Sequence, residues 1–145
     1  MKKWIIAICI LISGGVLFLI IKTDEQTLGE NYYYLPEYEA YDVGYPEGGI
    51  IYKSSEKNLF SNVIIHGNVI RMIDNGDFIL AIQLKNDSTR IDKKQLLHYF
   101  IIEKKSDIVH GPFDKEKYLQ KRQELRVPEE LKLKEWKTKK FMPMM

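Results

Sequence analysis

The sequence predicts an α+β protein: an N-terminal transmembrane helix, then a mainly antiparallel β-sheet domain with one packed C-terminal helix. Three observations support this class. Residues 4–21 form an uninterrupted apolar run, two β-branched runs flank a turn at 74–77, and a charged helix with a capping residue follows Asp114. Apolar length, strand composition and capping residues are independent structural signals. The 145-residue chain therefore divides into an anchor and a body.

The anchor is Trp4–Ile21, which has no charged residue and no proline. At about 1.5 Å per residue, a helix of this length nearly spans a hydrocarbon core of roughly 30 Å. Lys2 and Lys3 precede it, and basic residues hold that end in the cytoplasm. We therefore expect a single-pass protein of the inner (cytoplasmic) membrane, with the body extracytoplasmic.

Two other readings of this segment stay open. A signal peptidase site at Ser13–Gly15 would leave residues 16–21 as an apolar mature terminus. Lipidation at Cys9 would require small residues before the cysteine, but Ile8 precedes it. The uncleaved anchor accounts best for the sequence. Cys9 is also the only cysteine, so the body has no disulfide.

The body has about 120 residues, enough for one domain with one core. We expect the anchor over 1–22, a linker over 23–30, the domain over 31–131 and a basic amphipathic tail over 132–145. The formal net charge of +2 gives no reason to expect a nucleic-acid partner. The charge is uneven, however, because residues 22–50 carry seven acidic side chains and residues 115–145 carry ten basic ones.

The first part of the domain, Asn31–Tyr45, is rich in tyrosine. Aromatic residues favour strands, but Pro36 cannot donate to a central ladder, so an edge strand or extended ribbon is predicted. Residues 45–49 read as a turn, with proline early and glycine late. A short strand, Ile50–Lys53, should follow.

The clearest element is a hairpin over Val63–Leu84, in which β-branched runs flank Asp74–Asp77. Asn-Gly suits a type I′ turn with two central residues, which would place Ile73 opposite Phe78. Both faces are apolar near the turn, so we expect the hairpin to be central in one sheet of four to six strands and covered on both sides. Gly67 marks a bulge or bend.

A further strand is predicted over Leu96–Glu103, and a short one over 108–110. Asp114 is a good N-cap, with Phe113 positioned to pack on Tyr118 as a hydrophobic staple. The helix should continue to about Leu125, because the residue before Pro128 disfavours the α conformation.

From Val69 onward the order of parts resembles a known family. The matching segments are Asp77–Gln83, Tyr99–Lys105, His110–Phe113 and the charged helix ending at Val127-Pro128. They are similar to an uncharacterised family of small bacterial envelope proteins, many of them lipoproteins, with a β domain, a Gly-Pro turn and a Lys/Glu-rich C-terminal helix. The resemblance implies an envelope location and assigns no catalytic residue. This chain departs from the family in lacking a lipidation motif.

No pattern in the sequence indicates a metal or cofactor. The histidines His66, His98 and His110 lack the spacing of metal ligands. The Asp74–Asp77 segment lacks the later glutamate of a calcium loop and is better explained as a hairpin turn. We expect neither a cofactor nor a metal, and no enzymatic activity.

The acidic, tyrosine-rich segment is the predicted partner-binding surface, since exposed tyrosines are favoured in recognition. Its candidate residues are Tyr32, Tyr34, Glu37, Tyr38, Glu39, Tyr41 and Asp42. The expected function is a membrane-anchored, non-enzymatic binding or accessory module of the bacterial envelope, with an envelope protein as partner. Two alternatives are an immunity or inhibitor protein against an envelope-acting toxin or enzyme, and a carbohydrate-binding protein or hydrolase using carboxylates.

The tail interleaves basic and aromatic residues in a pattern typical of contact with anionic lipid. The candidate lipid-contacting residues are Trp136, Lys137, Lys139, Lys140 and Phe141. Docking of the tail on the acidic segment of the same chain and a frayed terminus are the alternatives.

Overall fold

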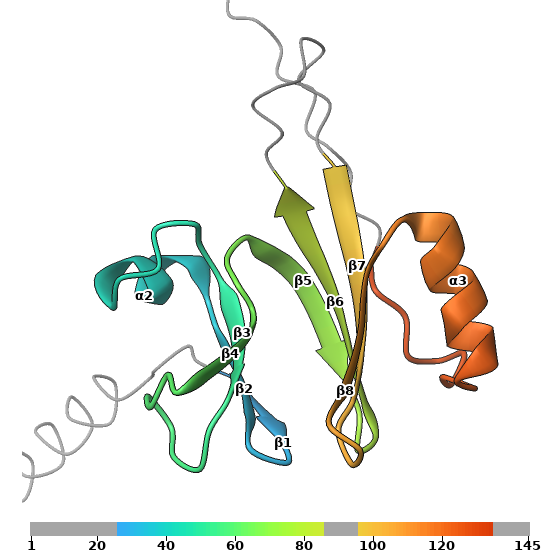
Figure 1. The fold of residues 1–145 in the computed structure, drawn as a ribbon, viewed down its shortest axis with the longest axis horizontal. Helices are drawn as coiled ribbons and strands as arrows, with labels where there is room; N and C mark the ends of the chain where they lie inside the picture. Colours follow the sequence, from blue (N-terminus) through green and yellow to red (C-terminus); the bar gives the residue numbers. More distant parts are fainter. Residues whose placement is uncertain (1–25, 86–95, 135–145) are drawn as a thin grey trace, which may run out of the picture.

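The computed structural model describes residues 26–85 and 96–134, which form eight strands and two helices (Figure 1). The predicted anchor, residues 86–95 and the tail from 135 onward lie outside the described residues. The elements are β1 Gln26–Gly29, β2 Tyr32–Leu35, α2 Glu37–Asp42, β3 Ile50–Lys53, β4 Asn62–Ile65, β5 Val69–Asp74, β6 Phe78–Lys85, β7 Leu96–Glu103, β8 Ile108–Phe113 and α3 Lys115–Glu124.

The strands form two sheets rather than the single sheet that was predicted. The first sheet has the order β1-β2-β3-β4 and the second has β5-β6-β7-β8, with every pair antiparallel. The sheets face each other, with α2 outside the first and α3 outside the second (Figure 1). The α+β class, the antiparallel pairing and the packed C-terminal helix are confirmed for the described residues.

The run predicted as one strand from Val63 is divided between the two sheets. It breaks at His66–Asn68, where Gly67 has φ +73° and Asn68 has φ +51°. These left-handed conformations turn the chain, so β4 completes the first sheet and β5 begins the second. The predicted bend at Gly67 is therefore correct, but it separates two sheets instead of bending one strand.

The core fills the space between the sheets, and smaller clusters cover their outer faces. The central cluster joins Leu28, Tyr32, Ile51 and Ile65 of the first sheet to Val69, Ile79, Ala81, Phe100 and Ile102 of the second. On β6, Leu80 points the other way and packs with Tyr118 of α3. Because successive strand side chains alternate between faces, both faces of the hairpin are covered, as predicted.

The hairpin register differs from the prediction. Ile73 lies opposite Leu80, and the Asn75 N–H donates to the Phe78 carbonyl at 3.0 Å. The central residues are therefore Gly76 and Asp77, one position later than expected. The Asn75 side-chain oxygen accepts from the Asp77 and Phe78 N–H groups at 2.9 and 2.8 Å, and this local capping sets the turn. β5 is also an edge strand, not a central one.

The N-terminal part of the domain contains more regular structure than predicted. β1 lies inside the segment expected to be a linker, and it makes β2 an interior strand between β1 and β3. Pro36 ends β2 and serves as the N-cap residue of α2. The edge strand or ribbon predicted for residues 31–45 is therefore wrong: the segment is an interior strand followed by a short helix.

The C-terminal part follows the prediction closely. The Asp114 carboxylate accepts from the Lys117 N–H at 2.8 Å and caps α3. Arg122 then donates to the carbonyls of Pro128 and Leu131 at 3.1 and 2.8 Å, which holds the segment after α3 against the second sheet. β8 extends to Phe113, beyond the predicted 108–110, and includes the cis Gly111–Pro112 bond.

A buried lysine joins the two sheets at the end of the sandwich opposite α2. The Lys104 side chain is only 3% exposed, and its ammonium donates to the carbonyls of Leu28 in β1 and Asn75 in the hairpin turn. It also pairs with the Asp74 carboxylate at 2.9 Å. One ammonium thus satisfies acceptors from both sheets, and an ammonium has three N–H donors available for this.

We predict that Lys104→Met lowers the free energy of unfolding by roughly 3 kcal/mol, because three buried or half-buried acceptors lose their donor. The measurement is thermal and urea unfolding of the full chain in detergent. Lys105→Met is the matched control, since its ammonium pairs with Asp77 at 2.6 Å on the open surface and is 76% exposed. Equal destabilisation by both variants would contradict the bridging role of Lys104.

Candidate functional site

The α2 helix carries the exposed part of the predicted partner-binding segment. Ala40 is fully buried against Leu35, Ile50 and Tyr52 on the outer face of the first sheet, which fixes how the helix sits. Opposite this contact, Tyr38 and Tyr41 are 53% and 52% exposed. Glu37 and Asp42 are exposed beside them, and Glu39 is half-buried. We call Glu37, Tyr38, Tyr41 and Asp42 the α2 surface.

The helix forms here because its first turn is acidic. Glu37 and Glu39 lie near the N-terminus, where the partial positive charge of the helix favours carboxylates. The Ala40 N–H donates to the Pro36 carbonyl at 2.9 Å, and the Tyr45 N–H donates back to Ala40 at 2.8 Å. The short helix is therefore closed at both ends and presents its tyrosines in a defined direction.

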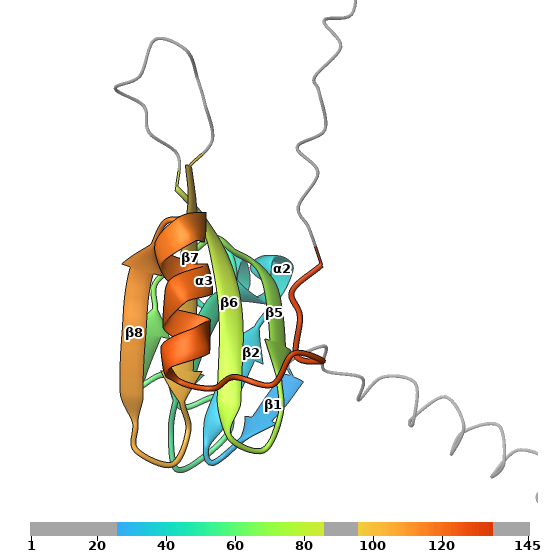
Figure 2. The ribbon, with the colours of Figure 1, turned by 90° about the vertical axis from the view of Figure 1, so that its right-hand side faces the viewer.

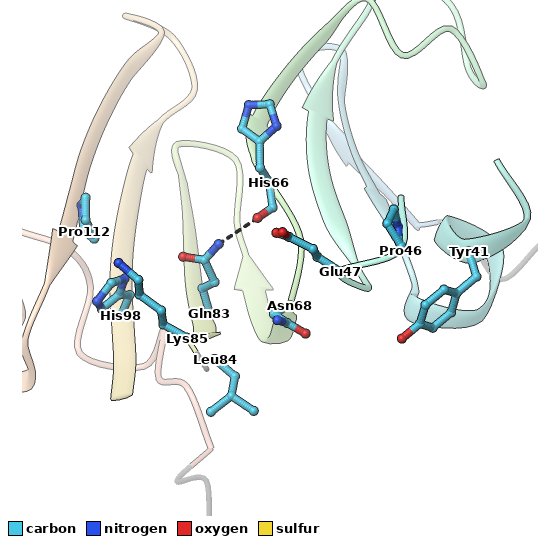
Figure 3. A pocket seen from close by; sticks show the side chains of 10 residues that line it. All are labelled: Tyr41, Pro46, Glu47, His66, Asn68, Gln83, Leu84, Lys85, His98 and Pro112. Atoms are coloured by element: carbon cyan, nitrogen blue, oxygen red, sulfur yellow. Dashed lines mark hydrogen bonds between the residues drawn. The ribbon is translucent and has the colours of Figure 1, made fainter. Parts of the chain in front are cut away.

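A pocket of about 630 Å³ adjoins the α2 surface at the junction between the two sheets (Figure 3). Tyr41 of α2 is part of its wall. The other lining residues come from the loop before β3, the β4–β5 link, β6, β7 and β8: Pro46, Glu47, His66, Asn68, Gln83, Leu84, Lys85, His98 and Pro112. The pocket therefore joins the α2 surface to both sheets.

Backbone hydrogen bonds hold the junction in one conformation. The Asn68 N–H donates to the Glu47 carbonyl at 2.7 Å, and its own carbonyl accepts from Leu84 at 2.9 Å. The Gln83 amide reaches across and donates to the His66 and Gly67 carbonyls at 2.9 and 3.0 Å. These bonds hold the loop before β3, the β4–β5 link and β6 together, so the pocket wall is preorganised.

The pocket is lined by polar and charged groups of mixed kinds. Burial and the nearby Lys85 lower the pKa of His98, so its imidazole is neutral at pH 7. In Figure 3 the imidazoles of His66, in the β4–β5 link, and His98, on β7, lie apart. Within residues 26–85 and 96–134, no three His, Cys, Asp or Glu side chains come together as metal ligands would. The arrangement suits hydrogen-bonded recognition of a polar surface.

Two of the predicted partner-binding residues have internal positions instead. Tyr32 is only 1% exposed and donates to the Asp107 carboxylate at 3.0 Å, and these conditions raise its pKa to about 12. Tyr34 is half-buried and donates to the Val69 carbonyl at 3.3 Å, linking the sheets. Neither residue therefore belongs to the exposed α2 surface. The tail candidates from Trp136 to Phe141 lie outside the described residues.

Of the pocket residues, only Tyr41 is among the partner-binding residues that the sequence predicts. His66, Asn68 and Gln83 lie within or beside strand patterns, where they read as ordinary strand or bend positions. The available signal was the polar His66-Gly67-Asn68 interruption of an apolar run. This interruption lines a pocket only because the chain passes there from the first sheet to the second, and no local sequence pattern specifies that crossing.

We predict that Gly67→Ala destabilises the domain by about 2 kcal/mol. Gly67 has φ +73°, and an added Cβ would lie 2.5 Å from the Glu47 Cβ. Unfolding of the full chain in detergent measures the effect. Gly76→Ala is the control, because no atom beyond its two chain neighbours lies within 4 Å of its added Cβ. If the two variants are equally stable, the junction is not tightly packed at Gly67.

A second prediction concerns acid stability. Hydrogen bonds from Lys53 and Tyr32 hold the pKa of Asp107 below its ordinary 3.8. A depressed carboxyl pKa stabilises the fold above the unfolded value, and this contribution is lost as pH falls through the folded value. The Tm difference between wild type and Asp107→Asn should therefore be present at pH 7 and shrink below about pH 4. A Tm difference for Asp107→Asn that stays constant across this pH range would refute the linkage.

The fold and the site together define a two-sheet α+β domain with an acidic, tyrosine-bearing helix beside a polar junction. The sequence matches the DUF3997 family, described as a protein of unknown function, over residues 30–137. The chain therefore belongs to that family, which agrees with the resemblance to an uncharacterised family. No curated protein matches the chain, and no solved structure matches it. Across the described ranges, neither helix has the length and apolar character needed to cross a membrane.

Proposed function

We propose that this protein is a non-enzymatic binding module of the bacterial cell envelope, anchored in the cytoplasmic membrane through residues 4–21 and presenting the α2 surface to a protein partner. The observation that carries the proposal is the pair of exposed tyrosines, Tyr38 and Tyr41, on a helix that Ala40 fixes against the sheet. Rigid aromatic side chains supply contact area with little loss of conformational entropy on binding.

The charge of this surface supports a basic partner. Glu37 and Asp42 flank the exposed tyrosines, and Glu47 follows in the adjoining pocket wall. Opposite charges steer encounter and set specificity, while the aromatic groups provide the buried contact. A more specific form of this proposal is an immunity or inhibitor protein. In that case the basic partner that binds the α2 surface is a toxin or an enzyme.

The anchor brings the domain close to the bilayer. Tethering raises the effective concentration of the α2 surface near other envelope components without any new contact. The tail residues Trp136, Lys137, Lys139, Lys140 and Phe141 form part of the same proposal as lipid-contacting groups.

The test is site-specific photo-cross-linking of the full chain in intact membranes. A benzophenone amino acid at Tyr41 should give a discrete adduct, and the same residue at Leu119 on α3, which is 48% exposed, is the matched control. Glu37→Lys combined with Asp42→Lys should lower the association rate about tenfold at low salt. Identical adducts from both positions, or an association rate unchanged by the charge reversal, would contradict the proposal.

The inhibitor version has its own readout. If the cross-linked partner is an enzyme or toxin, the purified full chain should abolish its activity, and the double charge reversal should restore it. If the partner keeps its activity at a saturating concentration of the purified full chain, the α2 surface has an accessory role instead.

A further inference from the structure

A second surface lies on the opposite side of the molecule from α2. The groove is formed by α3, β6, β7 and the segment that follows α3, and its volume is about 1140 Å³. Arg122 builds one wall, because its guanidinium holds the Pro128 and Leu131 carbonyls. The apolar groups that line it include Ile82, Leu97, Tyr99, Leu119, Val127 and Leu133. Leu119 is 48% exposed, so this apolar surface is open to the outside.

The charged residues around this groove are almost all cations. The lining contains Lys115, Arg122, Arg126, Lys132 and Lys134 against one carboxylate, Glu129. Glu129 lies 3.8 Å from Lys132 on the exposed surface, where such a pair contributes little. An apolar floor with a cationic rim complements a molecule that has both an apolar part and an anionic head.

Two charged parts of this chain do not complement the groove. The residues beyond the described C-terminal end are themselves basic, with Lys137, Lys139 and Lys140 in the sequence, so they would repel the rim. The acidic α2 surface lies outside the other sheet of the same molecule (Figure 1). Charge complementarity therefore favours an anionic occupant from outside the chain.

The membrane is the nearest source of anionic amphiphiles. Gln26, where β1 begins, is five residues beyond Ile21, the end of the predicted anchor. An extended chain covers at most about 18 Å in that interval, so the domain stays close to the bilayer surface. Figure 2 shows that the described N-terminal and C-terminal ends lie on the same side of the domain, the side of β1 and β5.

We propose that this groove docks on anionic phospholipid of the membrane that holds the anchor. Phosphate headgroups contact the cationic rim, and Leu119 and Leu133 meet the apolar part of the lipid. The inference rests on the anchoring part of the proposed function. It adds a second, electrostatic attachment that orients the domain and leaves the α2 surface turned away from the groove.

The test places a polarity-sensitive fluorophore at two leucines of equal exposure. In a Cys9→Ser background, the full chain carries either Leu119→Cys in the groove or Leu59→Cys in the loop between β3 and β4, which is 49% exposed. Each labelled chain is reconstituted into nanodiscs that contain nitroxide-labelled lipid, made of phosphatidylcholine alone or with phosphatidylglycerol added. Quenching of the fluorophore reports contact with lipid.

The expected result is quenching at position 119 that requires phosphatidylglycerol and is reversed by salt, with little quenching at position 59. Arg126→Gln with Lys132→Gln should lower the docked population at least about tenfold. The inference is overturned if quenching at position 119 is the same with and without phosphatidylglycerol. It is also overturned if the double substitution leaves quenching unchanged. If the fluorescence of the label at position 119 responds to soluble polyglutamate but not to lipid, the inference is likewise overturned, in favour of an acidic protein partner.

Flotation separates this inference from the proposal on which it rests. A chain that floats with the nanodiscs but shows no quenching at position 119 is anchored without groove docking, which refutes only the inference. A chain that fails to float refutes the anchor, and groove docking is refuted with it.

Discussion

The structure depends on one buried ammonium that is shared between two sheets. Each sheet alone is a four-stranded meander with apolar groups on both faces, and it needs a layer on each side. Apolar packing between the sheets is non-directional and does not fix how one lies on the other. Lys104 adds direction, because its donors reach a carbonyl of β1 and the turn between β5 and β6 together. The hydrogen bond from Tyr32 to Asp107 adds a second tie at the same end of the sandwich.

At the other end of the sandwich, the two sheets are joined by the chain itself, and the candidate site forms there. The His66–Asn68 link crosses from one sheet to the other, and Glu47 packs against Gly67, where there is no side chain. The α2 helix is placed beside this junction through Ala40 and the hydrogen bond from Tyr45. Because the junction beside the exposed helix is held by these bonds, the geometry of the proposed recognition surface is set by the scaffold. The acidic α2 surface and the cationic α3 groove consequently lie on opposite outer layers.

The predictions that succeeded rest on local physical signals. Asp114 was a capping residue in the sequence and is one in the structure, and Leu96–Glu103 is a strand with the expected bounds. The predictions that failed required knowledge of a neighbour. Pro36 indicates an edge strand in the sequence, but in the structure it only ends β2. β2 pairs with β3 on one side and, on the other, with β1, which the sequence does not predict. The hairpin register differs because of the Asn75 side chain. Its oxygen accepts hydrogen bonds from the Asp77 and Phe78 N–H groups, and this places Gly76 and Asp77 at the centre of the turn. The tyrosines of β2 and α2 look alike in sequence, yet Tyr32 is internal and Tyr38 is exposed.

The sequence by itself determined the strands β3, β6 and β7, the capped helix α3, the α+β class and the uneven distribution of charge along the chain. These properties follow from side-chain chemistry and spacing, which act over a few residues. Only the tertiary structure decided that the strands divide into two sheets, that Lys104 is buried between them, and that the polar residues of four separate segments line one pocket. The physical reason is that sheet pairing and burial depend on contacts between residues far apart in the chain, and no local pattern specifies which apolar face meets which.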